Sequence, residues 1–175
     1  MKLFQINLPM TAKNYVITRE AAQEKLHRMA LEIAENISED GVPLVLIGVR
    51  KSGMAIAEKL SVYLLRYIKV TLQIISVSLS KQFPGEVVLS EIIDFEDKNI
   101  VVVDDVCNTG RTMLYALKPL LDYHPRRIQT LVLVERMHKL FPIKPDYVGL
   151  SVATTIQDHI QVEIENGEVT GAFVA

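Results

Sequence analysis

The sequence has few of the features that mark secreted or membrane proteins. Cys107 is its only cysteine, so no disulfide can form within the chain. No apolar run approaches the length that crosses a bilayer, and no basic stretch followed by an apolar one opens the sequence. We therefore expect a cytoplasmic protein with no membrane partner, in which Cys107 is a small buried side chain rather than a nucleophile.

An excess of positive charge is also absent. The 19 Lys and Arg are balanced by 21 Asp and Glu, which gives a formal net charge of −2. This balance argues against attraction of nucleic acid to the whole surface, but it does not exclude a local basic patch. We find no internal repeat, low-complexity segment or linker, so 175 residues of which 49% are hydrophobic predict a single domain over residues 1–175.

The most informative stretch covers residues 100–112. Four β-branched aliphatic residues, 100–103, predict a strand buried on both faces, as in a parallel sheet, and Asp104 and Asp105 follow at its carboxyl end. Residues 109–112 then turn into a helical pattern. Backbone N–H groups, hydroxyls and a glycine suit a phosphate monoester, whereas paired carboxylates suit neighbouring hydroxyls or Mg²⁺. One ligand that combines a phosphate with a diol is a ribose 5-phosphate.

An aliphatic run, Asp-Asp, three residues and Thr-Gly-x-Thr together resemble the phosphoribosyl pyrophosphate signature of the type I phosphoribosyltransferases. The alternative is an ordinary buried strand followed by a capped helix. The resemblance implies that Mg²⁺ and the ribose hydroxyls are held by Asp104 and Asp105, directly or through water, and that the 5-phosphate is bound by Asn108, Thr109, Gly110, Arg111 and Thr112.

A second strand, turn and helix precede this motif and repeat its plan. Residues 43–49 read as a buried strand, and a helix that carries apolar residues at helical spacing follows the turn. In the family this turn binds pyrophosphate, which here implies Arg50, Lys51, Ser52 and Gly53. Relatives often have Thr-Arg-Gly or Lys-Gly-Gly where this chain has Lys51-Ser52-Gly53, so its basic charge lies earlier. A solvated basic loop is the alternative.

The rest of the pattern predicts an α/β fold. Thr18 is a good N-cap for an amphipathic helix that reaches Ile37, further strands are expected at 70–77 and 128–134, and Pro119 should end or kink the helix after the motif. Strands that alternate with helices predict a doubly wound parallel sheet flanked by helices, with ligands at the carboxyl ends of its strands. Lys81 lies in a polar segment, 78–91, that is either the family's flexible loop over the reacting centre or a plain β-turn.

The last third resembles the small hood that covers the nucleobase, and it is most similar to the bifunctional pyrimidine-operon attenuator/uracil phosphoribosyltransferases. We expect residues 135–175 to form most of this β hood, with a hairpin around residues 165–168. The resemblance assigns base binding to Glu135, Tyr147 and Val148, with Tyr147 stacking on the base. Core packing is the alternative for Tyr147.

Two residues bear on the choice of base. Glu135 takes the place of a lysine that serves the 6-oxo group in purine-using relatives, and Asn108 replaces their candidate base. A carboxylate among few fixed cations favours an N–H of uracil, so we expect uracil to be used above hypoxanthine and guanine. The implied partners are phosphoribosyl pyrophosphate, a nucleobase and a second copy of the chain in a homodimer or larger homo-oligomer. The alternatives are purine salvage and a nucleotide-sensing regulator that binds RNA, which the net charge does not favour.

Overall fold

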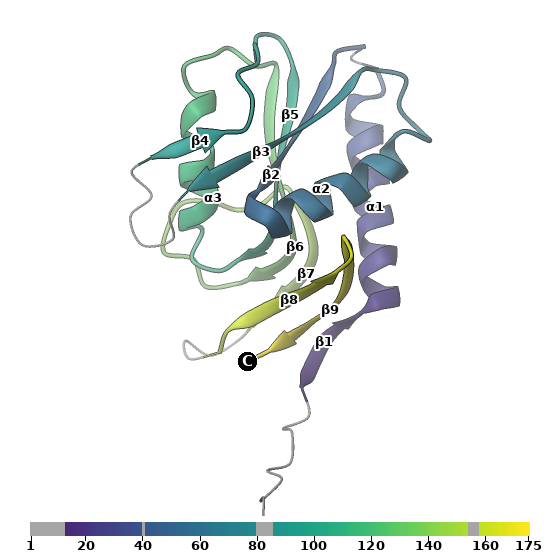
Figure 1. Cartoon of the computed structure of the whole chain (residues 1–175), viewed down its shortest axis with the longest axis vertical. Coiled ribbons are helices and arrows are strands. Elements are labelled where there is room, and N and C mark those ends of the chain that lie inside the picture. The colour runs from purple at the N-terminus through teal and green to yellow at the C-terminus, as the bar shows by residue number, and fades with distance from the viewer. Residues whose placement is uncertain (1–12, 40, 80–85, 154–157) are drawn as a thin grey trace, which may run out of the picture.

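The computed structural model of the chain describes residues 13–39, 41–79, 86–153 and 158–175, which form two sheets (Figure 1). The larger sheet has the strand order β4-β3-β2-β5-β6-β7, and the smaller has the order β1-β9-β8. The strands are β1 (Asn14–Thr18), β2 (Leu44–Val49), β3 (Leu72–Leu79), β4 (Val87–Leu89), β5 (Asn99–Cys107), β6 (Arg127–Arg136), β7 (Tyr147–Val152), β8 (Ile160–Glu165) and β9 (Glu168–Val174). The helices are α1 (Arg19–Ile37), α2 (Arg50–Leu64), α3 (Arg111–Ala116) and the 3₁₀ helix η1 (Lys118–Leu120). In the described ranges no helix could cross a membrane.

The order of the parallel strands places a crevice between β2 and β5. Strands β3, β2, β5, β6 and β7 run parallel, and only β4 at the edge is antiparallel. The chain runs outward from β2 to β3, then crosses back to β5 and continues to β6 and β7 on the other side. Ligands of open parallel sheets bind at the carboxyl ends of the strands where the order reverses in this way. The predicted doubly wound α/β fold is confirmed.

Helices cover both faces of the larger sheet. Helix α1 starts where the Thr18 hydroxyl accepts a 3.3 Å hydrogen bond from the Ala21 N–H, and its apolar stripe is buried with that of α2 on one face. Helix α3 packs on the other face. The predicted kink is present, because α3 ends at Ala116 and the chain tightens into the 3₁₀ turn that contains Pro119.

Helix α2 begins in direct contact with the backbone of β5. A Cβ at Gly53 would overlap the carbonyl oxygen of Val103, and a Cβ at Gly48 would overlap the backbone of Met54. These two glycines let the first turn of α2 lie against the sheet without side chains between them. Gly53 therefore serves packing here, and the residue that α2 brings to the carboxyl edge is Arg50.

The smaller sheet differs in its boundaries from the predicted hood. Its hairpin is the expected one, with β8 and β9 joined by Asn166 (φ 51°) and Gly167 (φ 78°). Residues 147–152, however, pair with β6 as strand β7 of the larger sheet, and the third strand of the smaller sheet is β1. The assignment of 135–175 to the hood was wrong for its first part. Tyr147 and Val148 pack into the core on opposite faces of the larger sheet, as expected for a parallel strand covered on both sides.

Gly53→Ala tests the contact between α2 and β5. Alanine normally stabilises a helix relative to glycine by up to about 1 kcal/mol, but here its methyl group would push α2 away from Val103. We expect a net loss of about 2 kcal/mol and a melting temperature that is lower by roughly 4–8 °C. Ser52→Ala, one residue earlier in the helix, is the control and should change stability by less than about 0.5 kcal/mol. A Gly53→Ala protein as stable as the parent would contradict the packing argument.

Candidate functional site

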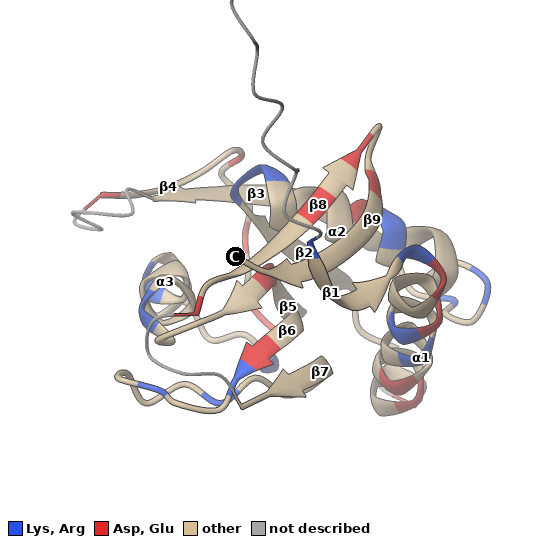
Figure 2. Cartoon of the chain, turned by 90° about the horizontal axis from the view of Figure 1, so that it is seen from below, with Lys and Arg blue, Asp and Glu red and all other residues tan. Residues whose placement is uncertain are grey.

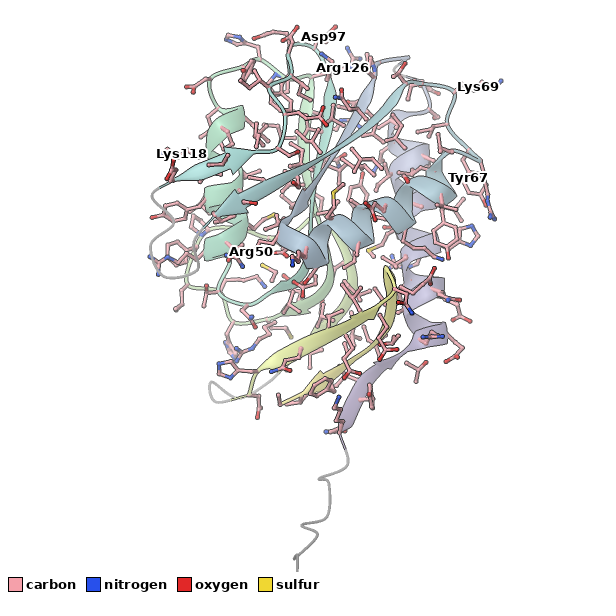
Figure 3. The ribbon with its side chains drawn as sticks, in the orientation of Figure 1. Arg50, Tyr67, Lys69, Asp97, Lys118 and Arg126 are labelled. Carbon is pink, nitrogen blue, oxygen red and sulfur yellow. The ribbon has the colours of Figure 1, made fainter. Side chains whose placement is uncertain are left out.

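Three neighbouring strands bring the predicted residues to one edge of the larger sheet. Arg50 follows β2, Asp104 and Asp105 lie near the end of β5, and Glu135 lies near the end of β6. These strands are adjacent in the order β2-β5-β6. Figure 2, which looks at this edge past the smaller sheet, shows acidic residues at the ends of β5 and β6. The amino-terminal edge, where Asp97 and Arg126 lie, is on the far side of the molecule (Figure 3).

A cavity of about 380 Å³ joins the two aspartates, Arg50 and the turn after β5. Its walls include Asn108, Thr109, Arg111 and Thr112 of the predicted phosphate turn, and Ile160 of β8 closes it from the smaller sheet. Sequence reasoning missed Ile160. The hairpin pattern located β8, but the pattern could not show which of its residues turns toward the cavity.

The two carboxylates differ in their surroundings. Asp104 is 7% exposed and Asp105 is half-buried, and each accepts a 2.9 Å hydrogen bond from the backbone N–H of the next residue. Burial, followed by the nearby Asp105 carboxylate, raises the pKa of Asp104 well above its ordinary value, and the Arg50 guanidinium opposes this shift. The pair therefore concentrates negative charge where a cation or a hydrogen-bond donor would relieve it.

The protein supplies only part of the ligand set that Mg²⁺ needs. Among the residues described, no group of three or more His, Cys, Asp or Glu comes together. Asp104 and Asp105 are therefore the two carboxylates available to the metal at this edge. Mg²⁺ is commonly held in this way, by one or two carboxylates together with water and the phosphates of a substrate.

The phosphate turn is held in shape by the segment between β6 and β7. Gly110 has φ 86°, and the Thr109 carbonyl accepts 3.0 Å hydrogen bonds from the N–H groups of both Leu140 and Phe141. In the part of the chain that the structure describes, the side-chain oxygen of Asn108 is buried without a hydrogen-bond partner. A buried polar atom of this kind is rare in proteins, and here it belongs to a residue that lines the cavity.

Arg50 is the most constrained residue at this edge. It has φ 55°, an uncommon conformation for a residue with a side chain, and it is the first residue of α2 (Figure 3). Its Nε donates to the Leu79 carbonyl at 3.2 Å, whereas its Nη2 is buried and has no partner among the residues that the structure describes. Arg50 thus brings a cation with unused donor capacity to the lining of this cavity. Strain at such a position is typical of functional sites.

The other predicted pyrophosphate residues are divided between two roles. Lys51 is exposed and, with Arg50, lines a shallow neighbouring cavity next to Ser76 and Ser78 of β3. Ser52 is half-buried, and the structure shows no contact of its side chain with that cavity. Lys81 lies outside the described residues.

Two of the three predicted base-binding residues lie in the wrong place. Tyr147 is 3% exposed in the core under α1, where its hydroxyl donates to Gln129 at 2.9 Å and accepts from Asn36 at 2.8 Å. Its ring has no face free for a base, so the core-packing alternative is correct. Val148 packs on the opposite face of the sheet, and its carbonyl accepts a 2.7 Å hydrogen bond from Arg28.

Glu135 does reach the carboxyl edge, but it is paired. Its Oε1 accepts from the Lys139 ammonium at 2.9 Å, and its Oε2 accepts from the Ser151 hydroxyl at 3.0 Å. The expectation of few fixed cations around this carboxylate did not include Lys139, which holds it. Lys139 lies in the irregular segment after β6, where spacing along the sequence does not predict which side chains meet.

Cys107 is not a nucleophile in this arrangement. It is buried beside the phosphate turn, and burial raises the pKa of its thiol to about 11. The Lys139 ammonium opposes this shift and the Glu135 carboxylate adds to it. The predicted role of a small buried side chain is thus supported.

A larger cavity lies elsewhere, near Tyr67 and Lys69 (Figure 3). Its volume is about 490 Å³, but surface residues at the ends of α1 and α2 line it. It holds no convergent set of buried polar groups, which is what distinguishes the smaller cavity between β2 and β5.

The fold and the edge described above define an α/β protein with a candidate site for a sugar phosphate at the switch point of its sheet. Residues 18–166 match the family described as "Phosphoribosyl transferase domain". The chain belongs to this family, and the resemblance of its motif to the type I phosphoribosyltransferases is confirmed.

Relatives and solved structures agree with this assignment. A "Bifunctional protein PyrR" of Clostridium kluyveri is 31% identical, over 89% of this chain and 92% of its own length. A "Bifunctional protein PyrR" of Deinococcus radiodurans is 33% identical, over 92% of this chain and 93% of its own length. The hypoxanthine phosphoribosyltransferase of Trypanosoma cruzi superimposes with a TM-score of 0.79 at 20% identity, over 93% of this chain and 96% of its own. A hypoxanthine-guanine phosphoribosyltransferase of Bacillus anthracis superimposes with a TM-score of 0.71 at 22% identity, over 91% of this chain and 97% of its own. At these identities the structures show the shared fold.

The buried carboxyl of Asp104 should lower the free energy of unfolding of the ligand-free protein at neutral pH. Because its folded-state pKa is raised, the folded chain is most stable below the ordinary carboxyl pKa and loses stability as the pH rises toward the raised value. Asp104→Asn should therefore raise the melting temperature at pH 7, by about 2–4 °C for each kcal/mol gained. The gain should shrink as the pH falls toward 4. Asp97→Asn, at the opposite edge, is the control. A gain that does not depend on pH would contradict this explanation.

Proposed function

We propose that the protein transfers the phosphoribosyl group of phosphoribosyl pyrophosphate to uracil and releases pyrophosphate. The observation that carries the proposal is the order of the strands β2, β5 and β6 at the carboxyl edge. It lines up the Arg50 guanidinium, a pair of carboxylates with a phosphate turn, and a pocket that contains Glu135 and Lys139. A leaving pyrophosphate, a ribose 5-phosphate and an incoming base require these three environments in this order.

The central strand suits the ribose. Asp104 and Asp105 face the same cavity as the turn 108–112, so one ligand can place its hydroxyls at the carboxylates and its 5-phosphate on the turn. When Mg²⁺ is bound there, it supplies positive charge against the oxygens of the ribose and the pyrophosphate. The side chains themselves orient the sugar and hold its C1 between β2 and β6.

The flanking strands suit the two groups that exchange at C1. Arg50 on the β2 side offers the buried Nη2 donor to the departing pyrophosphate, with Lys51 beside it. The pocket near Glu135 lies on the β6 side. The bond from C1 to the pyrophosphate oxygen breaks, the bond from C1 to N1 of uracil forms, and the N1 proton is lost to solvent. Catalysis is then a matter of positioning and charge stabilisation, with no covalent nucleophile.

Uracil is the proposed base for two reasons. The motif and the last third of the chain resemble the attenuator/uracil phosphoribosyltransferases, and the relatives at 31% and 33% identity are named as bifunctional PyrR proteins. Asn108 also stands where purine-using relatives carry their candidate base. The solved hypoxanthine enzymes share the fold, which does not decide the base.

Pyrophosphate release tests the reaction. The protein is incubated with phosphoribosyl pyrophosphate, Mg²⁺ and, in turn, uracil, hypoxanthine or guanine. Uracil should give the highest kcat/KM. The double variant Asp104→Asn/Asp105→Asn should reduce turnover at least about 100-fold while it remains folded, because the charge that orients the ribose is gone. Asp97→Asn should leave turnover unchanged. No release with any base, or full activity of the double variant, would refute the proposal.

A second candidate activity is nucleotide-dependent binding of RNA, which the word "bifunctional" in the names of the relatives favours. A filter-binding titration with the leader RNA of a pyrimidine operon, with and without UMP, tests it. We expect UMP to increase the affinity, and the affinity to fall at least about 10-fold between roughly 50 and 200 mM salt. Binding that neither UMP nor salt alters would exclude the regulator.

A further inference from the structure

The pocket on the β6 side contains the ion pair of Glu135 and Lys139. An open cavity of about 400 Å³ is lined by Glu135, Met137, Lys139, Lys144 and Ser151. Glu135 pairs in register with Cys107 of β5, so the cavity begins one strand away from the two aspartates. The segment that carries Lys139 also holds the phosphate turn, through the hydrogen bonds of Leu140 and Phe141 to Thr109. The ion pair and the ribose site are thus parts of one edge.

The geometry of the pair is fixed. The side chains of Lys139 and Glu135 are 16% and 13% exposed, and their charged atoms are 2.9 Å apart. The ammonium also donates to the carbonyl of Arg136, and Ser151 holds the second oxygen of the carboxylate. Lys144, by contrast, is exposed. Lys139 is therefore the cation of this cavity that is held in place before a ligand arrives.

Both groups retain hydrogen-bonding capacity. An ammonium has three N–H donors, of which two are used, and a carboxylate accepts at about four positions, of which two are used. The cavity thus offers one donor and one acceptor side by side. Met137, which is exposed in the same cavity, adds an apolar surface against which a flat ring can lie.

We propose that Lys139 and Glu135 together read the lactam edge of the base, a carbonyl next to a ring N–H, and that Lys139 determines specificity for oxo over amino bases. In uracil the ammonium takes a ring carbonyl, and the carboxylate takes the N3–H. The carbonyl that the ammonium takes is the 4-oxo group, which is the one that cytosine lacks. In cytosine the 4-amino group would face the ammonium as donor against donor, and the N3 lone pair would face the carboxylate.

This inference rests on the proposed function for the position of the ribose, and it changes one expectation drawn from it. Because Lys139 supplies a donor, a 6-oxo group no longer faces only a carboxylate, and hypoxanthine or guanine also presents a carbonyl beside an N–H. The pair separates oxo from amino bases. Any preference for uracil over the oxopurines must come from another part of the site, such as Asn108.

Equilibrium binding of UMP and CMP in the presence of Mg²⁺ tests the proposal without requiring turnover. Wild-type protein should bind UMP at least about 100-fold more tightly than CMP, because a polar site built for one edge penalises the reversed one. In Lys139→Met the carbonyl loses a charged donor and the freed carboxylate can accept from the amino group of cytosine. The UMP-to-CMP affinity ratio should therefore fall at least about 10-fold.

Two further variants separate recognition from loss of structure. Lys139→Arg keeps the charge and the donors and should retain most of the preference. Lys69→Met makes the same chemical change at the opposite edge (Figure 3) and should leave the ratio at the wild-type value. A wild-type protein that does not prefer UMP, or a ratio that Lys139→Met leaves intact in folded protein, would overturn the proposal. Discrimination in binding without release of pyrophosphate would instead refute the proposed transfer and leave the role of Lys139 standing.

Discussion

The constraint on which this site depends is the parallel pairing of β2, β5 and β6 in the interior of the sheet. The residues of β2 are all buried, as are the first six of β5, so neither strand can slide or turn over without exposing a face of the core. Whatever follows these strands is therefore delivered to one edge at the spacing of neighbouring strands, about 4.8 Å. Gly48 and Gly53 extend the constraint to α2, which begins in contact with β5 and carries Arg50 to the aspartates.

The parts of the structure that follow from local patterns could be predicted. Buried β-branched runs, the N-cap at Thr18, the kink at Pro119 and the Asn-Gly hairpin each result from a few neighbouring residues, and all are present. The Asp-Asp and Thr-Gly-x-Thr pattern also located most of the cavity, because strand ends and the turns after them are set locally. The register of paired strands and the contacts between segments far apart in the sequence could not be predicted in this way.

Most of the errors and omissions concern the placement of one segment against another. Tyr147 precedes an alternating stretch that could have belonged to a separate small sheet, and only the pairing of β7 with β6 shows that its ring lies under α1. The role of Ile160 depends on how β8 is placed over the edge, and that of Lys139 on where a loop returns to the sheet. A sequence motif identifies the residues of its own turn that can contact a ligand. It does not identify residues that another segment of the chain brings to the same site.

The membership of β1 in the smaller sheet has a consequence for how the chain reaches its final form. Among the described strands, β1 pairs only with β9, which is separated from it by residues 19–167. During synthesis β1 must therefore wait, unpaired, until residues 168–174 have been made, whereas β2 and β3 can pair early. The sheet that provides Ile160 thus assembles after the strands β2 to β7, and pairings between such distant segments form slowly. The cavity at the carboxyl edge stays open on one side until β8 and β9 have been made, so the nascent chain acquires its finished pocket only after them.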